Sequence, residues 1–128
     1  MLDAVRRVLA EEPRVAFAMV FGSRARGTAR DDSDLDVAIG LGEPLDHHDV
    51  GELVSRLEEA TGRTVDLVLL DEAPPELAHR VFRDGVVVLE REPSLLIQRR
   101  ARAILDYLDF RPLAEILARG VLEAAKRG

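Results

Sequence analysis

The chain has 128 residues, no cysteine and a formal net charge of −6. This length predicts one domain, and the absence of cysteine excludes disulfide bonds and thiolate zinc sites. The acidic balance and the few aromatic residues argue against binding to long nucleic acids, which favours basic and aromatic surfaces. No apolar run reaches the ~20 residues of a membrane span, and the first residues lack the apolar stretch of a signal peptide. We therefore expect a cytoplasmic protein that does not contact membranes.

Hydrophobic patterning predicts helices and strands that alternate along the chain. Periodicity and apolar runs bounded by glycine or proline give, in chain order, a helix over 2–12, strands over 15–21 and 35–41, a helix from 46 or 49 to 62, a strand over 65–70, a helix over 74–85, a strand over 86–89 and helices from 93 onward. The run 15–21 is wholly apolar, which is typical of a strand buried on both faces. This order predicts an α/β (α+β) fold in which helices cover a mixed sheet. We expect a single domain with a core at 1–92 and a C-terminal helical extension at 93–128.

The C-terminal extension carries two surface features. One helix face bears an apolar stripe formed by Ile97, Ala101, Ile104, Leu105 and Leu108. A cluster of arginines in the same segment is either a docking patch or a solvated helix face, and consists of Arg99, Arg100 and Arg102.

Three aspartates lie in or beside predicted strands, where acids are scarce because burial of an unpaired carboxylate is unfavourable. Asp34 and Asp36 stand at the start of the second strand, and Asp66 lies in the third. Alternate residues of a strand share a face, so Asp34 and Asp36 point the same way. Such a pair can hold two hard cations ~3.5–4 Å apart, and magnesium prefers carboxylates together with phosphate oxygens and water. Asp66 either completes the cluster or is the base that deprotonates an attacking hydroxyl.

A Gly-Ser turn directly follows the first predicted strand. Gly22 lets the backbone approach a ligand closely, and amides at the start of a helix favour an anion. The Ser23 hydroxyl can donate a hydrogen bond to a phosphate oxygen, while Arg24 and Arg26 either neutralise triphosphate charge or are solvated. The turn alone is a weak signal. Followed by the three acids, it predicts a site for a nucleoside triphosphate and divalent metal ions.

The histidines give no comparable signal. His47 and His48 are adjacent at a helix start, where their side chains diverge, so we interpret them as solvated rather than as metal ligands. His79 lies between apolar residues of a predicted helix and is interpreted as a helix-surface residue.

The string from Gly22 to Gly27, followed by Ser33-Asp34-Leu35-Asp36, resembles the signature of the DNA polymerase β-like nucleotidyltransferase superfamily. The resemblance covers roughly residues 15–89. In its short length the chain is similar to the minimal nucleotidyltransferase (MNT) antitoxins of HEPN/MNT toxin–antitoxin pairs. The resemblance implies two magnesium ions held by Asp34, Asp36 and Asp66, and a triphosphate tail held at Gly22 and Ser23.

The resemblance also implies a reaction and a partner. The antitoxins of this group transfer AMP from ATP onto a tyrosine of a partner HEPN ribonuclease and release pyrophosphate. Two alternatives stay open at this stage. The chain is an antitoxin that neutralises its toxin by contact alone, for which the C-terminal helices would provide the surface. Or it is a small-molecule nucleotidyltransferase acting on an aminoglycoside-like hydroxyl, although the short chain leaves little room for a substrate-binding domain.

Overall fold

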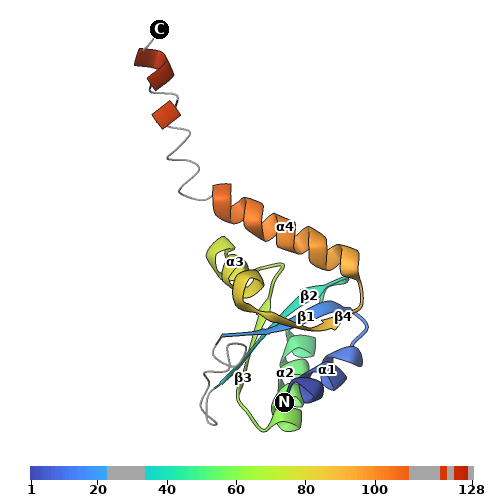
Figure 1. Ribbon diagram of the computed structural model, residues 1–128. Coiled ribbons are helices and arrows are strands. Elements are labelled where there is room, and N and C mark those ends of the chain that lie inside the picture. The colour runs from blue at the N-terminus through green and yellow to red at the C-terminus, as the bar shows by residue number, and fades with distance from the viewer. Residues whose placement is uncertain (23–33, 110–118, 121–122, 127–128) are drawn as a thin grey trace.

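A mixed four-stranded sheet carries helices on both of its faces in the computed structural model, which describes residues 1–22, 34–109, 119–120 and 123–126 (Figure 1). The elements are α1 (Leu2–Ala10), β1 (Val15–Phe21), β2 (Leu35–Leu41), α2 (His47–Thr61), β3 (Val65–Leu69), α3 (Pro75–Asp84), β4 (Val86–Glu90) and α4 (Pro93–Asp109). The strand order is β3-β2-β1-β4. β1 runs antiparallel to β2 and β4, whereas β2 and β3 are parallel. The predicted fold class is confirmed.

Helices α1 and α2 cover one face of the sheet (Figure 1). Their apolar stripes bury Val5 and Leu9 of α1 and Leu53 and Leu57 of α2. These side chains pack against the face of β2 that carries Leu35, Val37 and Ile39. The odd-numbered positions of β2 therefore point away from its aspartates, as alternation along a strand requires.

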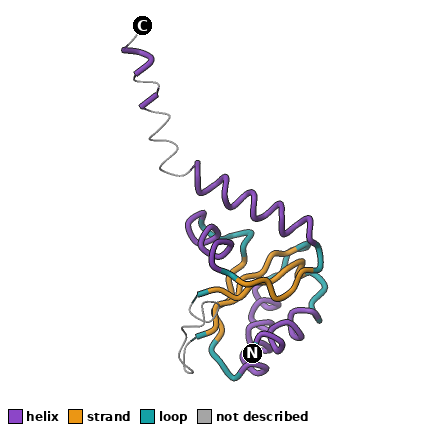
Figure 2. The backbone as a smooth tube through the Cα atoms, viewed as in Figure 1, coloured by secondary structure: helices purple, strands orange, loops and turns teal. Residues whose placement is uncertain are grey.

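Helices α3 and α4 cover the other face, so the central strands are sandwiched between two helical layers (Figure 2). β1 is buried at every position, which confirms the prediction from its apolar run. A β-bulge between Val15 and Phe17 turns both Ala16 and Phe17 toward α3 and α4. Gly40 makes room for this arrangement, because a Cβ at that position would lie 2.1 Å from the Phe17 ring.

The predicted end of the first helix is wrong by two residues. α1 ends at Ala10, and the amides of Glu11 and Glu12 instead bond three residues back, each at 3.2 Å. This tight last turn is stabilised by Arg91, whose guanidinium donates to the carbonyls of Ala10 and Glu12. The helix α2 agrees with its predicted ends, since Asp46 caps it and Gly62 ends it.

Helix α4 packs on the sheet with a face that the periodicity did not select. Its buried residues are Leu96 and Ala103, which join the core beneath α3 and α4. The predicted stripe instead faces away from the core, with Ile97 exposed by 65% and Leu105 by 57%. α4 is therefore apolar on two sides, and only one of them is covered by the described part of the chain. Within the described residues, no helix has the length and apolar character needed to cross a membrane.

Candidate active site

A row of three paired residues crosses the sheet at one end of β2 and β3. Phe21 of β1 is opposite Asp36 of β2, and Asp36 is opposite Asp66 of β3. Directly paired residues point to the same face, and neighbouring strands lie about 4.8 Å apart. The parallel register thus sets the Asp36 and Asp66 side chains next to each other on the face covered by α3 and α4.

Asp34 stands just before β2, two residues from Asp36, and is exposed. Its charge reaches the pair, because it contributes to the shifted pKa of Asp36. Three carboxylates from two adjacent strands are therefore electrostatically coupled at this edge.

Gly22 brings the backbone of the predicted turn against Asp36. It has a φ of 76°, in the left-handed region that favours glycine. A Cβ at this position would lie 2.3 Å from Oδ2 of Asp36, so any other side chain would displace the carboxylate. Ser23, Arg24 and Arg26, which the sequence also assigned to this turn, lie outside the described residues.

The Asp36 carboxyl has a pKa above its usual value of 3.8. Burial is the largest cause, followed by the negative charges of Asp66 and Asp34, while the guanidinium of Arg80 acts in the opposite direction. In the described part of the chain, no residue donates a hydrogen bond to Asp36 or Asp66 or forms an ion pair with them. Neither acid is therefore paired within the described residues, and Arg80 offsets only part of their charge.

A cavity of about 440 Å³ opens above the two acids. Its floor is formed by β1, β2 and β3, and its opposite wall by Leu77, Arg80 and Asp84 of α3. No motif in the sequence pointed to these three residues of α3. Helical spacing puts Leu77, Arg80 and Asp84 on one face of α3, but only the crossing of that helix over the sheet reveals that this face meets the acids.

The donor set suits a divalent cation of the magnesium type. Uncompensated carboxylate oxygens are the protein ligands that such hard cations prefer. Over residues 1–22 and 34–109, no three acidic or histidine side chains gather closely enough to enclose an ion by themselves. Magnesium usually binds one or two carboxylates and completes its shell with water and phosphate oxygens, which an open edge of acids allows.

The histidines do not form a second site. His48 is exposed, with Nε2 at 3.9 Å from a carboxylate oxygen of Glu52. The carboxylate of the neighbouring Asp49 forms an ion pair with Arg14. The solvated interpretation of His47 and His48 is therefore confirmed. His79 is half-buried rather than a plain surface residue, because its ring stacks on that of Tyr107 with centroids 3.9 Å apart.

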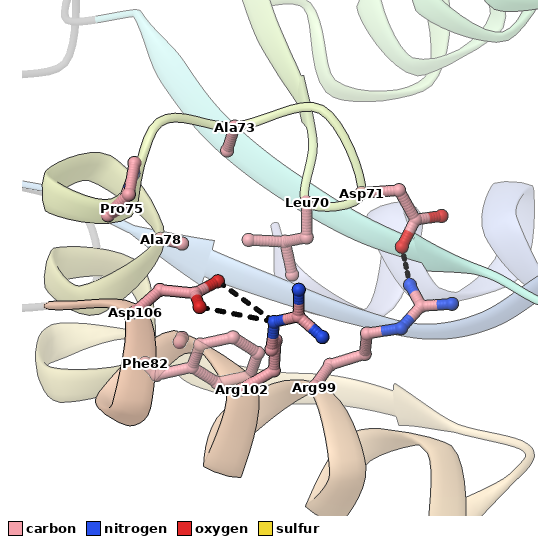
Figure 3. Close-up of a pocket in the computed structure, with 10 residues that line it drawn as sticks. Leu70, Asp71, Ala73, Pro75, Ala78, Phe82, Arg99, Arg102 and Asp106 are labelled. Carbon is pink, nitrogen blue, oxygen red and sulfur yellow. Dashed lines mark hydrogen bonds and ion pairs between the residues drawn. The ribbon is translucent and has the colours of Figure 1, made fainter. Parts of the chain in front are cut away.

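A second cavity, of about 340 Å³, lies between α3, α4 and the loop after β3 (Figure 3). Figure 3 shows Arg99 paired with Asp71, and Arg102 donating to both carboxylate oxygens of Asp106 at 3.1 Å. Arg100 lies over the Phe82 ring, 5.9 Å from its centroid. All three arginines of the predicted cluster thus engage partners within the chain, which does not favour a docking patch.

Comparison with known proteins identifies the family. The model of the polymerase beta nucleotidyltransferase family matches residues 3–94, which include the row of paired acids and Gly22. The chain belongs to this nucleotidyltransferase family. Its fold is therefore that of a nucleotidyltransferase.

Relatives within the family include a protein adenylyltransferase MntA of Thermococcus cleftensis. It is 35% identical over 88 residues, which cover 69% of this chain and 89% of that protein. A crystal structure of a toxin–antitoxin with AMP-PNP contains a chain with the same fold, at a TM-score of 0.78 and 24% identity, covering 94% of this chain and 98% of that one. A Shewanella oneidensis complex of a tri-AMPylated HEPN toxin with its MNT antitoxin also matches, at a TM-score of 0.69 and 20% identity, covering 95% and 99%.

Proposed function

We propose that this chain is a magnesium-dependent protein adenylyltransferase of the cytoplasm. In this proposal it transfers AMP from ATP onto a tyrosine hydroxyl of a HEPN-type toxin, which it thereby neutralises, and pyrophosphate is released. The observation that carries the proposal is the in-register pair of Asp36 and Asp66 beside Gly22, in a chain of the nucleotidyltransferase family.

The choice of acceptor rests on the relatives. The Thermococcus cleftensis protein is named a protein adenylyltransferase, and it is matched over 89% of its length. The Shewanella oneidensis complex joins an MNT antitoxin to a HEPN toxin that carries AMP. The AMP-PNP complex supports ATP as the nucleotide. A partner protein with an accessible tyrosine is therefore the substrate class that we assign.

The reaction forms one bond and breaks another at the α-phosphorus of ATP. The tyrosine oxygen forms a bond to the α-phosphorus. The bond between the α-phosphorus and the oxygen that bridges to the β-phosphate breaks, and pyrophosphate leaves. Two magnesium ions, held by Asp34, Asp36 and Asp66, would supply neutralisation of the phosphate charge. Gly22 brings the backbone close to Asp36, so that a phosphate at the turn would meet the carboxylates. Phe21, Val68 and Leu77 supply apolar walls that limit water.

Asp66 has two candidate roles in this scheme, and they make different predictions. As a ligand, it would shape metal affinity, so Asp66→Asn would be rescued in part by more magnesium. As the base that accepts the tyrosine proton, it would shape the pH profile, so Asp66→Asn would lose the acidic limb of the rate profile at saturating magnesium. Rates measured over magnesium concentration and pH distinguish the two roles.

The test of the whole proposal is transfer of labelled AMP. Wild-type chain with radiolabelled ATP, magnesium and a co-expressed HEPN protein should label that protein, and Asp36→Asn should reduce the rate at least ~1000-fold. The matched control is Asp106→Asn, which removes a carboxylate from the second cavity and should leave the rate within about twofold. Labelling that persists in Asp36→Asn would refute the assigned site. Labelling of an aminoglycoside without any protein would favour the small-molecule alternative.

A second candidate function is neutralisation of the toxin by contact alone. The exposed apolar side of α4, with Ile97, Ile104 and Leu105, is the observation that favours it, since large exposed apolar patches commonly mark protein contacts. Ile104→Asp would then abolish neutralisation of toxin ribonuclease activity, whereas Asp36→Asn would leave it intact. The opposite pattern would support neutralisation by AMP transfer.

A further inference from the structure

The geometry points to Arg80 of α3 as a contact for the phosphate that is transferred. We infer that its guanidinium binds a non-bridging oxygen of the α-phosphate of the nucleotide, from the wall opposite Asp36 and Asp66. The inference rests on the proposed function, and it adds to that function a residue outside the sequence motif of glycine, serine and acids.

Arg80 is the cation among the described residues that line the cavity. The carboxylates in the same lining are those of Asp36 and Asp66 from the sheet and of Asp84, one helical turn after Arg80 on α3. Its charge is felt at Asp36, the middle residue of the row that crosses β1, β2 and β3. Gly22 lies against Asp36 from the β1 side, Asp66 flanks it on the β3 side, and Arg80 lines the same cavity from α3.

Arg80 also differs from the arginines of the other cavity in having an available guanidinium. Arg99 is paired with Asp71 and Arg102 with Asp106. Across the described ranges, Arg80 forms no hydrogen bond or ion pair, and its side chain is exposed. A guanidinium presents a planar fork of donors that matches phosphate oxygens, so an unengaged one beside a nucleotide cavity is suited to an anionic ligand.

The backbone beneath Arg80 is held firmly in place. Its neighbours Ala78 and Val81 are buried, with exposed fractions of 7% and 0%, and Val81 packs in the core between the sheet and α4. The donor is therefore projected from a rigid helix, as charge stabilisation at a reacting phosphate requires.

Among the phosphates of ATP, the α-phosphate is the one that the arrangement favours. The acids and Arg80 enclose the cavity from opposite walls, and the α-phosphorus must lie near the acids if the transfer is to occur there. With the α-phosphorus near the acids, its non-bridging oxygens would face the wall formed by α3. Without Arg80, no cation among the described residues of that wall would balance their charge. The β- and γ-phosphates extend toward Gly22, at the end of β1, and away from the centre of the row.

The experiment compares Arg80→Gln with Arg102→Gln, which makes the same change in charge on an exposed helical arginine of the second cavity. Binding to each purified protein is measured by calorimetry with adenosine, AMP and the non-hydrolysable analogue α,β-methylene-ATP, in magnesium. Arg80→Gln should bind AMP and the analogue about 10-fold to 100-fold more weakly and adenosine equally well, because one charge-assisted contact is lost. Arg102→Gln should match the wild type for all three, and Arg80→Lys should recover part of the affinity.

The outcomes separate this inference from the proposed function. Weaker binding of the analogue with unchanged binding of AMP would move the contact to the β- or γ-phosphate and overturn the inference. Equal weakening of adenosine, or no change with any ligand, would also overturn it. In each of these cases wild-type AMP transfer could still occur, whereas failure of the wild type to label any HEPN protein would refute the proposed function and leave the binding result interpretable.

Discussion

Two cavities lie on the side of the sheet that carries α3 and α4, and they differ in how their charges are balanced. The cavity between α3, α4 and the loop after β3 measures about 340 Å³, and its arginines each have a carboxylate partner. The cavity over Asp36 and Asp66 measures about 440 Å³, and neither acid has a hydrogen bond or an ion pair among the described residues.

The two cavities are similar in volume, so charge balance rather than volume distinguishes them. Paired charges stabilise the fold and leave no demand for a ligand. Burial, together with the charges of Asp66 and Asp34, raises the pKa of Asp36, and acids without partners favour a cation that would neutralise them. Changes at the cavity over Asp36 and Asp66 should therefore affect AMP transfer, whereas changes at the other cavity should affect only stability.

The largest effect on stability is expected for Gly22→Ala. The new methyl group would need the space of the Asp36 carboxylate and an unfavourable backbone conformation, so we expect AMP transfer to fall at least ~100-fold and unfolding free energy to fall by about 1–3 kcal/mol. Labelling rates and urea unfolding measure the two effects. The control is Gly51→Ala in α2, where an added Cβ would meet no described residue outside its own stretch of helix within 4 Å, and where the protein should gain up to about 1 kcal/mol. Normal transfer by Gly22→Ala would contradict the described turn.

An intermediate effect on stability alone is expected for Arg99→Ala. This change leaves Asp71 half-buried without its cation, so urea unfolding should show a loss of about 1 kcal/mol while the rate of AMP transfer stays within twofold. Arg102→Ala, whose side chain is 77% exposed, should change stability by less than about 0.5 kcal/mol. A marked loss of AMP transfer in Arg99→Ala would show that the second cavity also contributes to activity, and would contradict the proposed difference between the cavities.

The smallest effect concerns the pH dependence of stability without ligands. Because the pKa of Asp36 is raised in the folded chain, the folded state holds its proton more tightly than the unfolded state. Its contribution therefore destabilises the fold as pH rises from about 3.8 through the raised pKa, and the loss is complete above it. Asp36→Asn should remove this loss and raise Tm at pH 7 in scanning calorimetry, while reducing AMP transfer at least ~1000-fold. A lower Tm for Asp36→Asn at pH 7 would show that the charged carboxylate stabilises the free protein.

The sequence predicts most of the fold because local patterning and burial agree over much of the chain. The wholly apolar run of β1 is buried on both faces, and Asp46 and Gly62 bound α2 as expected. One predicted boundary, the end of α1, is wrong for a tertiary reason, and the face of α4 that packs on the core was not predicted. The carbonyls at the end of α1 are taken by Arg91, from 81 residues away, and α4 docks through Leu96 and Ala103 rather than through its longer apolar stripe.

The sequence predicts those residues of the candidate site whose side-chain type is unusual for their position, such as an acid in or beside an apolar strand or a glycine directly after one. The aspartates at 34, 36 and 66 and the glycine at 22 carry such a signal, and their roles remain proposals. That Asp36 lies opposite Asp66 depends on a parallel register that no local pattern encodes. The contribution of Arg80 was invisible for the same reason, because a single arginine on an amphipathic helix looks like a solvated residue until the helix is placed over the sheet.

The parallel pairing of β2 with β3 has one more consequence, for how the chain tolerates insertions. The pairing runs from Leu35 opposite Val65 to Ile39 opposite Leu69, with the aspartates opposite each other near its start. A single residue inserted within β3 would reverse the face of every position after it, or shift Asp66 away from Asp36 by about 3.3 Å. Natural length variation in homologous chains should therefore concentrate in the connections before and after β3, while the strand itself should contain no insertions or deletions.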